Sequence, residues 1–405
     1  MAGYRRRNST IGLDYGTHST KVVHRVRGEE MGRVLRFDRS CEGYPLNAAP
    51  SVMREIEGRL YFGTLAVELT GGIDYGSLKA ELLGRTGDPG LDRQIDVLTS
   101  AYLAWAIGEI FDQDPQLAAD NPILQVSAPT CHAGNLELKQ RYLRIVHASY
   151  TYVQNHLQVE QGVELSWLDE TLTPVLDATI PASSERRFFV APETVAPMVS
   201  LQLEPFNDTG IFLIADMGAA TTEMSVCAVN DETFGNAILA YSDSTESRGG
   251  SDLFEIDAML VGPSQERLDN FLHLLKLQAD KVWLRGYYKD KDCQAASRRW
   301  KKLQVLLTGG ATHHPEVRKH FDKKVYPNAA WPPSETRLAV DRHYPTSLEC
   351  DPGFEEEDLS LFAVANGLSV QLPLWPRFFN EIEIEELKSL DDTDNDAVPS
   401  YLEIG

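Results

Sequence analysis

The stretch IGLDYGTHSTK at residues 11–21 decides the fold, and IADMGAATTEMSV at residues 214–226 repeats its design about 200 residues later. Each stretch leads from a hydrophobic strand into an aspartate, and then into a turn of small residues and hydroxyls. One copy alone is weak evidence, because Asp and Gly are ordinary turn residues after a strand. Two copies in matching contexts predict a duplicated clamp for phosphate groups.

The residue types in these two turns suit phosphate and a divalent cation. Gly16 and Gly218 lack a Cβ, so the backbone N–H groups can approach phosphate oxygens closely. Additional hydroxyl donors are Thr17, Ser19, Thr221 and Thr222. Asp14 and Asp216 suit Mg²⁺, which prefers oxygen ligands and keeps several waters, so both carboxylates would act largely through the hydration shell of the ion.

With these two turns the chain resembles the actin, sugar kinase and heat-shock chaperone ATPase superfamily, most closely the nucleotide-binding domain of DnaK-type chaperones. Further similar motifs follow in family order across about residues 9–372. They are PSV (50–52), LKAELLGR (78–85), SAPT (127–130), VAPETVA (190–196), RGGSD (248–252), VLLTGGATHHPEV (305–317) and AVANGLSV (363–370).

The resemblance implies an α/β protein with a two-lobed actin-like ATPase fold, built from duplicated ribonuclease H-like βββαβα domains with the nucleotide in a cleft between the lobes. Lobe I would span 1–205, with an insertion at about 131–189. Lobe II would span 206–377, with a shortened outer subdomain at about 250–302. Residues 378–405 form an acidic tail, expected to be flexible or to dock on a partner.

Hydrophobic periodicity predicts the elements of this plan. The strands expected in the first half are 9–15, 21–26 and 33–38, and the helices are 91–111 and 136–153. A second meander is expected after Gly210, with strands 224–229 and 237–242.

The resemblance also assigns roles and ligands. Lys79 would approach the γ-phosphate and the attacking water, Thr221 would hydrogen-bond the phosphate, and Glu193 or a water held by Asp216 would orient the nucleophile. Pro192 and Glu193 stand in the reverse of the family's order, so slow hydrolysis and binding without turnover both stay open. The expected ligands are ATP or ADP with Mg²⁺, the metal being held by Asp14 and Asp216. The expected nucleotide-binding positions are Asp14, Gly16, Thr17, His18, Ser19, Lys21, Gly218, Ala219, Ala220, Thr221, Thr222, Gly249, Gly250, Asp280, Lys281, Gly309, Gly310, Ala311 and His313.

The adenosine contacts depart most from the family pattern. Only about 60 residues separate Gly250 from Gly309, fewer than DnaK-type proteins place there. A helix is expected over 266–284, and Asp280 and Lys281 stand at its end. These two residues either replace the family's acidic and basic adenosine contacts or belong to the solvated surface. His313 stands where the family has a base-stacking arginine, and either stacks on a purine or lies in an exposed loop.

Composition narrows the class of protein. A formal net charge of −22 over 405 residues opposes direct binding to nucleic acid. The chain has no run of 18 apolar residues, so no membrane association is expected. Five cysteines without CxxC spacing favour reduced thiols and a cytoplasmic location.

The expected function is a chaperone-like ATPase switch whose lobe closure regulates a protein partner, as a monomer or in a hetero-complex. After Gln371 no room remains for a peptide-binding domain, so the partner surface is expected on the acidic tail or on the insertion. The insertion contains the aromatic residues Tyr150, Tyr152 and Trp167, which either form a contact surface or pack on lobe I. Two alternatives stay open: a bacterial actin-like filament ATPase, which the charge opposes, and a small-molecule kinase of the same superfamily.

Overall fold

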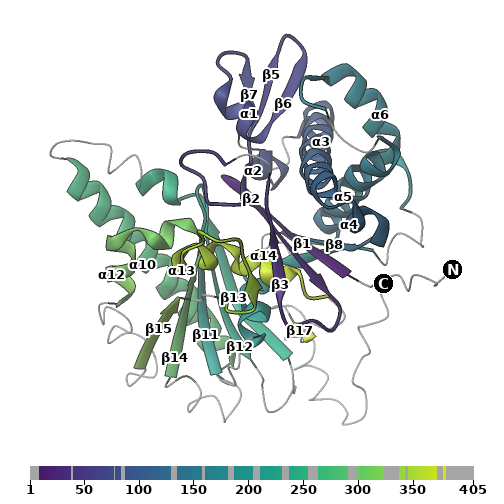
Figure 1. Cartoon of the computed structure of the whole chain (residues 1–405). Helices are drawn as coiled ribbons and strands as arrows, with labels where there is room; N and C mark the ends of the chain where they lie inside the picture. Colours follow the sequence, from purple (N-terminus) through teal and green to yellow (C-terminus); the bar gives the residue numbers. More distant parts are fainter. Residues whose placement is uncertain are drawn as a thin grey trace. The chain divides into compact units, whose positions relative to one another are not determined.

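The computed structural model describes residues 9–37, 40–76, 78–83, 87–128, 135–156, 160–180, 187–203, 210–229, 237–253, 263–290, 300, 302–322, 337–342, 345–371 and 377–379. It is an α/β protein that divides into two compact units. The first unit comprises Met1–Ala128, Asn135–Ala191 and Pro345–Pro373, and the second comprises Pro129–Gly134, Pro192–Tyr344 and Leu374–Gly405. Figure 1 shows the elements of both units.

The main sheet of the first unit has the strand order β10-β8-β1-β2-β3-β16, with β4 paired to β2. Its strands are β1 (Ser9–Tyr15), β2 (Ser19–Val26), β3 (Gly32–Leu35), β4 (Ala49–Pro50), β8 (Ile123–Ala128), β10 (Phe188–Pro192) and β16 (Leu348–Glu349). Strand β1 runs antiparallel to β2 and parallel to β8. All seven residues of β1 are buried, as expected for a central strand that is covered on both faces.

A smaller sheet and a group of helices complete the first unit (Figure 1). The small sheet has the order β7-β5-β6-β9, from β5 (Met53–Ile56), β6 (Arg59–Phe62), β7 (Ile73–Asp74) and β9 (Val163–Glu164). The helices are α1 (Gly63–Glu68), α2 (Leu78–Leu83), α3 (Pro89–Gln113), α4 (Pro115–Asp120), α5 (Leu136–His156) and α6 (Leu165–Asp177). Asp88 caps α3 by accepting from the N–H groups of Gly90 and Leu91, with Pro89 at the first helical position.

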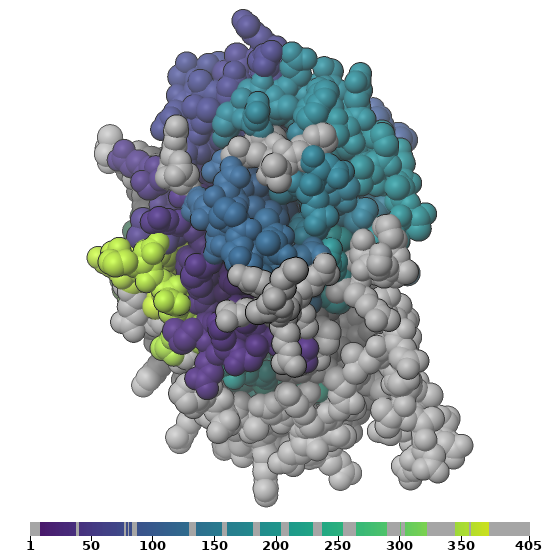
Figure 2. All heavy atoms as spheres, turned by 45° about the vertical axis from the view of Figure 1, so that its right-hand side comes forward, coloured from purple at the N-terminus to yellow at the C-terminus, as the bar shows by residue number. Residues whose placement is uncertain are grey.

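The late segment 345–371 packs with the first unit although it follows the second in sequence. It contains β16, α13 (Glu356–Leu359), η3 (Ser360–Phe362) and α14 (Ala363–Leu368). Buried Arg25 on β2 donates from Nη2 to Asn366 Oδ1 at 2.7 Å and from Nε to Ser369 Oγ at 3.0 Å. Figure 2 shows the yellow-green residues of this segment against the purple residues of the first strands.

The sheet of the second unit has the order β15-β14-β11-β12-β13-β17. Its strands are β11 (Gly210–Met217), β12 (Thr222–Val229), β13 (Ala237–Glu246), β14 (Lys302–Thr308), β15 (Arg337–Arg342) and β17 (Arg377–Phe379). The other elements are α8 (Ala196–Gln202), α10 (Pro263–Asp290), η2 (Gly310–His313) and α12 (Pro315–Asp322). Helix α10 packs on β12 and β13 through buried Trp283 and Gln278.

The two main sheets follow one plan. Each opens with an antiparallel three-strand meander, β1-β2-β3 or β11-β12-β13, and a later strand pairs in parallel with the first strand of that meander. Each sheet also ends on a short strand that pairs in parallel with the third strand, β16 with β3 and β17 with β13. The predicted meanders and the predicted helices in 91–111 and 136–153 are confirmed, each within a few residues.

Three expectations need correction or comment. The helix expected over 266–284 runs on to Asp290, so Asp280 and Lys281 lie well inside it rather than at its end. Tyr150 and Tyr152 are 2% and 3% exposed and belong to the core, so of the three aromatic residues considered for a partner surface only Trp167 is exposed, at 39%. The first unit comprises 1–128, 135–191 and 345–373, whereas the sequence analysis places lobe I over 1–205.

Parts of several predicted segments lie outside the described residues, among them the LKAELLGR and SAPT motifs, the insertion at about 131–189 and the outer subdomain at about 250–302. Residues 380–405, the greater part of the acidic tail, lie outside the described residues, as does residue 38 at the end of the third predicted strand. Within the described part of the chain, none of the helices combines the length and apolar character needed to cross a bilayer.

Candidate functional site

The turn between β1 and β2 is tight because Gly16 has no side chain. A Cβ at Gly16 would lie 2.6 Å from the carbonyl oxygen of Ser19, closer than real Cβ atoms approach. Asp14 pairs with Lys21 across the hairpin, and Tyr15 with Thr20. The turn Gly16-Thr17-His18 is therefore fixed by the strand register and by the missing Cβ.

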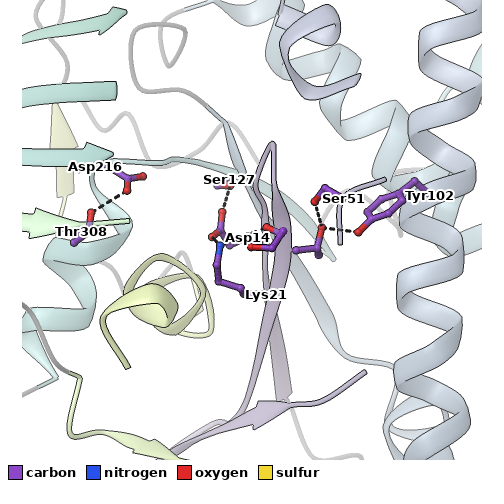
Figure 3. Close-up of polar contacts among 9 residues, drawn as sticks. Asp14, Lys21, Ser51, Tyr102, Ser127, Asp216 and Thr308 are labelled. Carbon is purple, nitrogen blue, oxygen red and sulfur yellow. Dashed lines mark hydrogen bonds and ion pairs between the residues drawn. The ribbon is translucent and has the colours of Figure 1, made fainter. Parts of the chain in front are cut away.

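The carboxylate of Asp14 is buried beneath this turn and is ion-paired. Lys21 Nζ lies 3.0 Å from Asp14 Oδ2, and Ser127 Oγ at the end of β8 donates to Asp14 Oδ1 at 3.4 Å (Figure 3). The Lys21 ammonium also donates to the carbonyl oxygen of Ser19 at 3.4 Å. The structure thus brings together Asp14, Gly16, Ser19 and Lys21, and it places a fixed positive charge beside the turn.

A second set of contacts holds the same turn from its outer side. The backbone N–H of Ser51 donates to the carbonyl oxygen of His18 at 2.9 Å. Buried Tyr102 donates to Thr20 Oγ1 at 3.0 Å, and Thr20 Oγ1 lies 2.9 Å from Ser51 Oγ (Figure 3). The ring of His18 stacks on Tyr44 with centroids 4.2 Å apart. Burial lowers the pKa of His18, so the imidazole is neutral near pH 7.

The turn of the second unit has the same strand-turn-strand layout. Thr308 Oγ1, at the end of β14, donates to Asp216 Oδ1 at 3.1 Å, as Ser127 at the end of β8 does to Asp14 (Figure 3). The N–H of Gly218 donates to the carbonyl oxygen of Thr221 at 2.9 Å and closes the turn. Gly218, Ala219, Ala220 and Thr221 are all half-buried.

Two more of the predicted motifs converge on this turn. The N–H of Gly250 donates to Gly218 O at 2.8 Å, and the N–H of Ser251 donates to Ala219 O at 2.9 Å. Thr222 Oγ1 donates to the carbonyl oxygen of Arg248 at 2.8 Å. These bonds fasten the RGGSD segment onto the backbone of the Asp216 turn.

The TGGAT segment reaches the same place from the opposite side. Gly309 has φ +84°, and a Cβ there would lie 2.5 Å from Met217 O and 2.6 Å from Asp216 Oδ1. A Cβ at Gly250 would lie 3.5 Å from Ala311 Cβ. Three segments spread over about 100 residues of sequence thus meet at one turn, and their glycines permit the close approach.

Two adjacent glycines give a steric test of this convergence. A Cβ at Gly249 would lie 2.4 Å from Gly218 O and 2.5 Å from Ala219 O, both rigid backbone atoms, whereas the nearest contact at Gly250 is an ordinary 3.5 Å. We expect Gly249→Ala to lower the free energy of unfolding by about 1–3 kcal/mol, as overpacking typically does, and Gly250→Ala to change it by less than about 1 kcal/mol. Urea unfolding of both variants beside the wild type measures the difference. Equal losses would contradict the close packing of RGGSD on the turn.

Lys79 and Glu193 lie on different units. Lys79 is 6% exposed on the short helix α2 of the first unit, where Leu78 and Leu82 anchor the helix in the core. Glu193 is 7% exposed in the turn that follows β10, and its neighbour Thr194 is 2.9 Å from Ser225 Oγ on β12. Each side chain is buried within its own unit.

The expected adenosine contacts are less closely tied to the turn. Asp280 Oδ2 is ion-paired with Lys276 Nζ at 2.5 Å along α10, and Lys281 is exposed. Gln278 on the same helix donates to Thr222 O at 3.0 Å, so the helix itself is anchored beside the turn. His313 is half-buried in η2, four residues after Gly309. The structure therefore brings His313 near the glycine motif.

Sequence reasoning missed several residues that hold these elements in place. Thr308 and Ser127 orient the two aspartates. Each hydroxyl residue stands at the carboxyl end of a strand that pairs in parallel with the strand of its aspartate. The TGG and SAP motifs, which contain these two residues, were a sequence signal for this role. Tyr102 and Arg141 had no such signal, because each contacts segments far from it in sequence.

One cavity of the first unit is lined by residues other than those predicted for the site. A cavity of about 300 Å³ in the first unit is lined by Arg33, Val34, Leu35, Arg36, Ile110, Gln113, Asp114, Glu349, Cys350 and Asp351, none of them a predicted site residue. Across the described ranges, no group of three or more His, Cys, Asp or Glu side chains is placed to hold a metal ion.

Comparison with known proteins adds no relative: no protein-family model matches this chain, and no curated protein matches it.

Proposed function

We propose that this chain is a chaperone-like, ATP-binding and ATP-hydrolysing switch protein with a two-lobed actin-like fold. The observation that carries the proposal is the convergence in the second unit, where the 216–221, 248–252 and 308–311 segments meet through backbone hydrogen bonds and glycine contacts. The shared strand order of the two sheets supports the duplicated plan of that fold.

The second unit would bind phosphate through its turn. Ala219, Ala220 and Thr221 are half-buried and would present backbone N–H groups and a hydroxyl to phosphate oxygens. Gly309 and Gly310 would let a nucleoside lie against the backbone, with His313 beside it. In the first unit the Lys21 ammonium beside Gly16 would attract phosphate charge.

Each aspartate accepts a hydrogen bond from a hydroxyl at the end of a neighbouring strand, Asp14 from Ser127 and Asp216 from Thr308. A carboxylate oriented in this way would suit a role in which it holds Mg²⁺ through water. Asp14 already shares its charge with Lys21 at 3.0 Å, so it fits better as the partner that positions this lysine. Bound Mg²⁺ supplies charge neutralisation and orientation of the phosphates.

The proposed reaction is hydrolysis of ATP to ADP and phosphate. Water attacks the γ-phosphorus, the bond to the bridging oxygen breaks, and the bridging oxygen leaves with ADP. Lys79 would stabilise charge on the γ-phosphate, Thr221 would hydrogen-bond it, and Glu193 would orient the water. The burial of Lys79 and Glu193 suits such roles, because charges act more strongly away from bulk water.

Regulation of a partner protein completes the proposal. The described part of the insertion offers one exposed aromatic side chain, Trp167 on α6, among the acidic residues Glu164, Asp169 and Glu170. An aromatic residue with a polar rim is typical of partner contacts.

The test is thermal unfolding of the protein with Mg-ATP and with Mg-ADP. A ligand at 100 times its dissociation constant stabilises the native state by about 2.7 kcal/mol, so a clear rise in melting temperature is expected. Asp216→Ala should lose the magnesium-dependent part of this rise, while Asp169→Ala, an exposed carboxylate on α6, should keep it. A wild type whose melting is unchanged in millimolar Mg-nucleotide would sink the proposed function.

A further inference from the structure

Helix α2, which carries Lys79, is too short to be stable by itself. It has six residues, Leu78–Leu83, and isolated helices shorter than about 12 residues are marginal in water. The position of Lys79 therefore depends on what holds α2 from outside.

Leu78 and Leu82 pack α2 into the core, and Arg141 on α5 adds a polar hold. Its side chain is 6% exposed, and three of its nitrogen atoms donate to groups on two other helices. Nη1 donates to the carbonyl oxygen of Leu82 in the last turn of α2 at 3.0 Å. Nη2 donates to the carbonyl oxygen of Asp92 at 3.1 Å, and Nε donates to Asp96 Oδ1 at 2.6 Å, both on α3. One guanidinium thus ties α2 to α3 from a third helix.

The geometry of these contacts suits arginine alone. The planar guanidinium presents its donors in a rigid fork, whereas a lysine ammonium is a single point of charge on a flexible stem. The Asp96 carboxylate balances the buried charge and fixes the direction of the fork. The two carbonyl bonds then set where the C-terminal turn of α2 lies, and with it the backbone of Lys79 three residues before Leu82.

We propose that Arg141 is a positioning residue for Lys79, acting through the Leu82 carbonyl to hold the lysine where it meets the γ-phosphate. This inference rests on the proposed function. In this role Arg141 would not contact the nucleotide. Its replacement should therefore lower ATP turnover and leave the binding of ADP unchanged, because ADP has no γ-phosphate.

The experiment compares Arg141→Lys, Lys79→Ala and the double variant by turnover of Mg-ATP and by binding of Mg-ADP. Arg141→Lys keeps a charge beside Asp96 but loses the fork, so turnover should fall about tenfold to a hundredfold, as expected when a reacting group is displaced by about 1 Å. Mg-ADP affinity should stay within about twofold of the wild type. In the Lys79→Ala background the same change should add little, because its effect passes through Lys79.

Arg59→Lys is the matched control, since Arg59 also joins an acid and a carbonyl group, Glu164 and Gly162, but is 52% exposed. It should leave turnover unchanged. Should the wild type bind ATP without hydrolysing it, the ratio of ATP to ADP affinity replaces turnover in each comparison.

Three outcomes overturn the assignment of Arg141 while leaving the proposed function intact. The first is wild-type turnover in Arg141→Lys. The second is a variant that loses Mg-ADP binding or folding together with turnover. The third is a fall in turnover that is equally large when Arg141→Lys is made in the Lys79→Ala background. A wild type that binds neither Mg-ATP nor Mg-ADP overturns both proposals, and it is recognised before any variant is made.

Discussion

Gly12→Ala is expected to destabilise the first unit by about 3 kcal/mol or more, at the upper end of what overpacking costs. The added Cβ would lie 2.3 Å from Ala365 O and 2.4 Å from Ser369 N, the two atoms joined by a 3.0 Å hydrogen bond at the end of α14. Both are backbone atoms, so no change of rotamer relieves the overlap. Helix α14 would have to move away from β1, against the bonds that Arg25 makes to it.

Urea unfolding followed by circular dichroism measures this loss. Gly90→Ala in the same unit is the control, because its nearest new contact is the movable end of the Asp88 side chain at 3.2 Å, and alanine is favoured over glycine in a helix. If Gly12→Ala unfolds at the same urea concentration as the wild type, α14 does not cross β1 as closely as described.

Lys79→Ala is expected to lower Mg-ATP turnover by about a hundredfold or more, as removal of a contact made in the transition state does. A hundredfold loss corresponds to about 2.7 kcal/mol of transition-state stabilisation. Nucleotide binding should be largely retained, because the phosphate contacts proposed for the two turns do not involve Lys79. Turnover of ATP and the melting shift with Mg-ADP measure the two effects separately.

The control for this variant is Lys139→Ala, which removes an exposed lysine from α5 of the same unit. It should hydrolyse ATP at the wild-type rate. Comparable turnover in Lys79→Ala would show that another residue stabilises the γ-phosphate. A wild type that binds ATP but never hydrolyses it would make the protein a nucleotide sensor.

The local pattern of apolar residues predicted secondary structure correctly where the structure of a segment depends mainly on its own residues. The strand-like patterns of apolar residues in 9–15 and 21–26 predicted β1 and β2, and the helical spacing in 91–111 predicted α3. The local pattern was a poor guide to the end of α10. Charged residues near 280 suggested a last turn, but Val282 and Trp283 are fully buried against the second sheet, so packing continues the helix to Asp290.

The partners of the two aspartates also could not be predicted from the local sequence pattern. Asp14 is ion-paired with Lys21, and Asp216 accepts a hydrogen bond from Thr308. The first contact follows from the register of the β1–β2 hairpin, which places residues 14 and 21 opposite each other. The second follows from the parallel pairing of β11 with β14, which joins residues about 90 apart.

Short-range patterns were enough to predict the repeated strand-aspartate-turn design, the places of its glycines and most of the strands and helices around them, because periodicity and turn chemistry act over a few neighbouring residues. The tertiary structure alone decided that three glycine segments meet at one turn, that α14 returns to lie on Gly12, and that Arg141 holds the helix of Lys79. Those contacts join residues far apart in the chain. They form only when whole elements pack against one another.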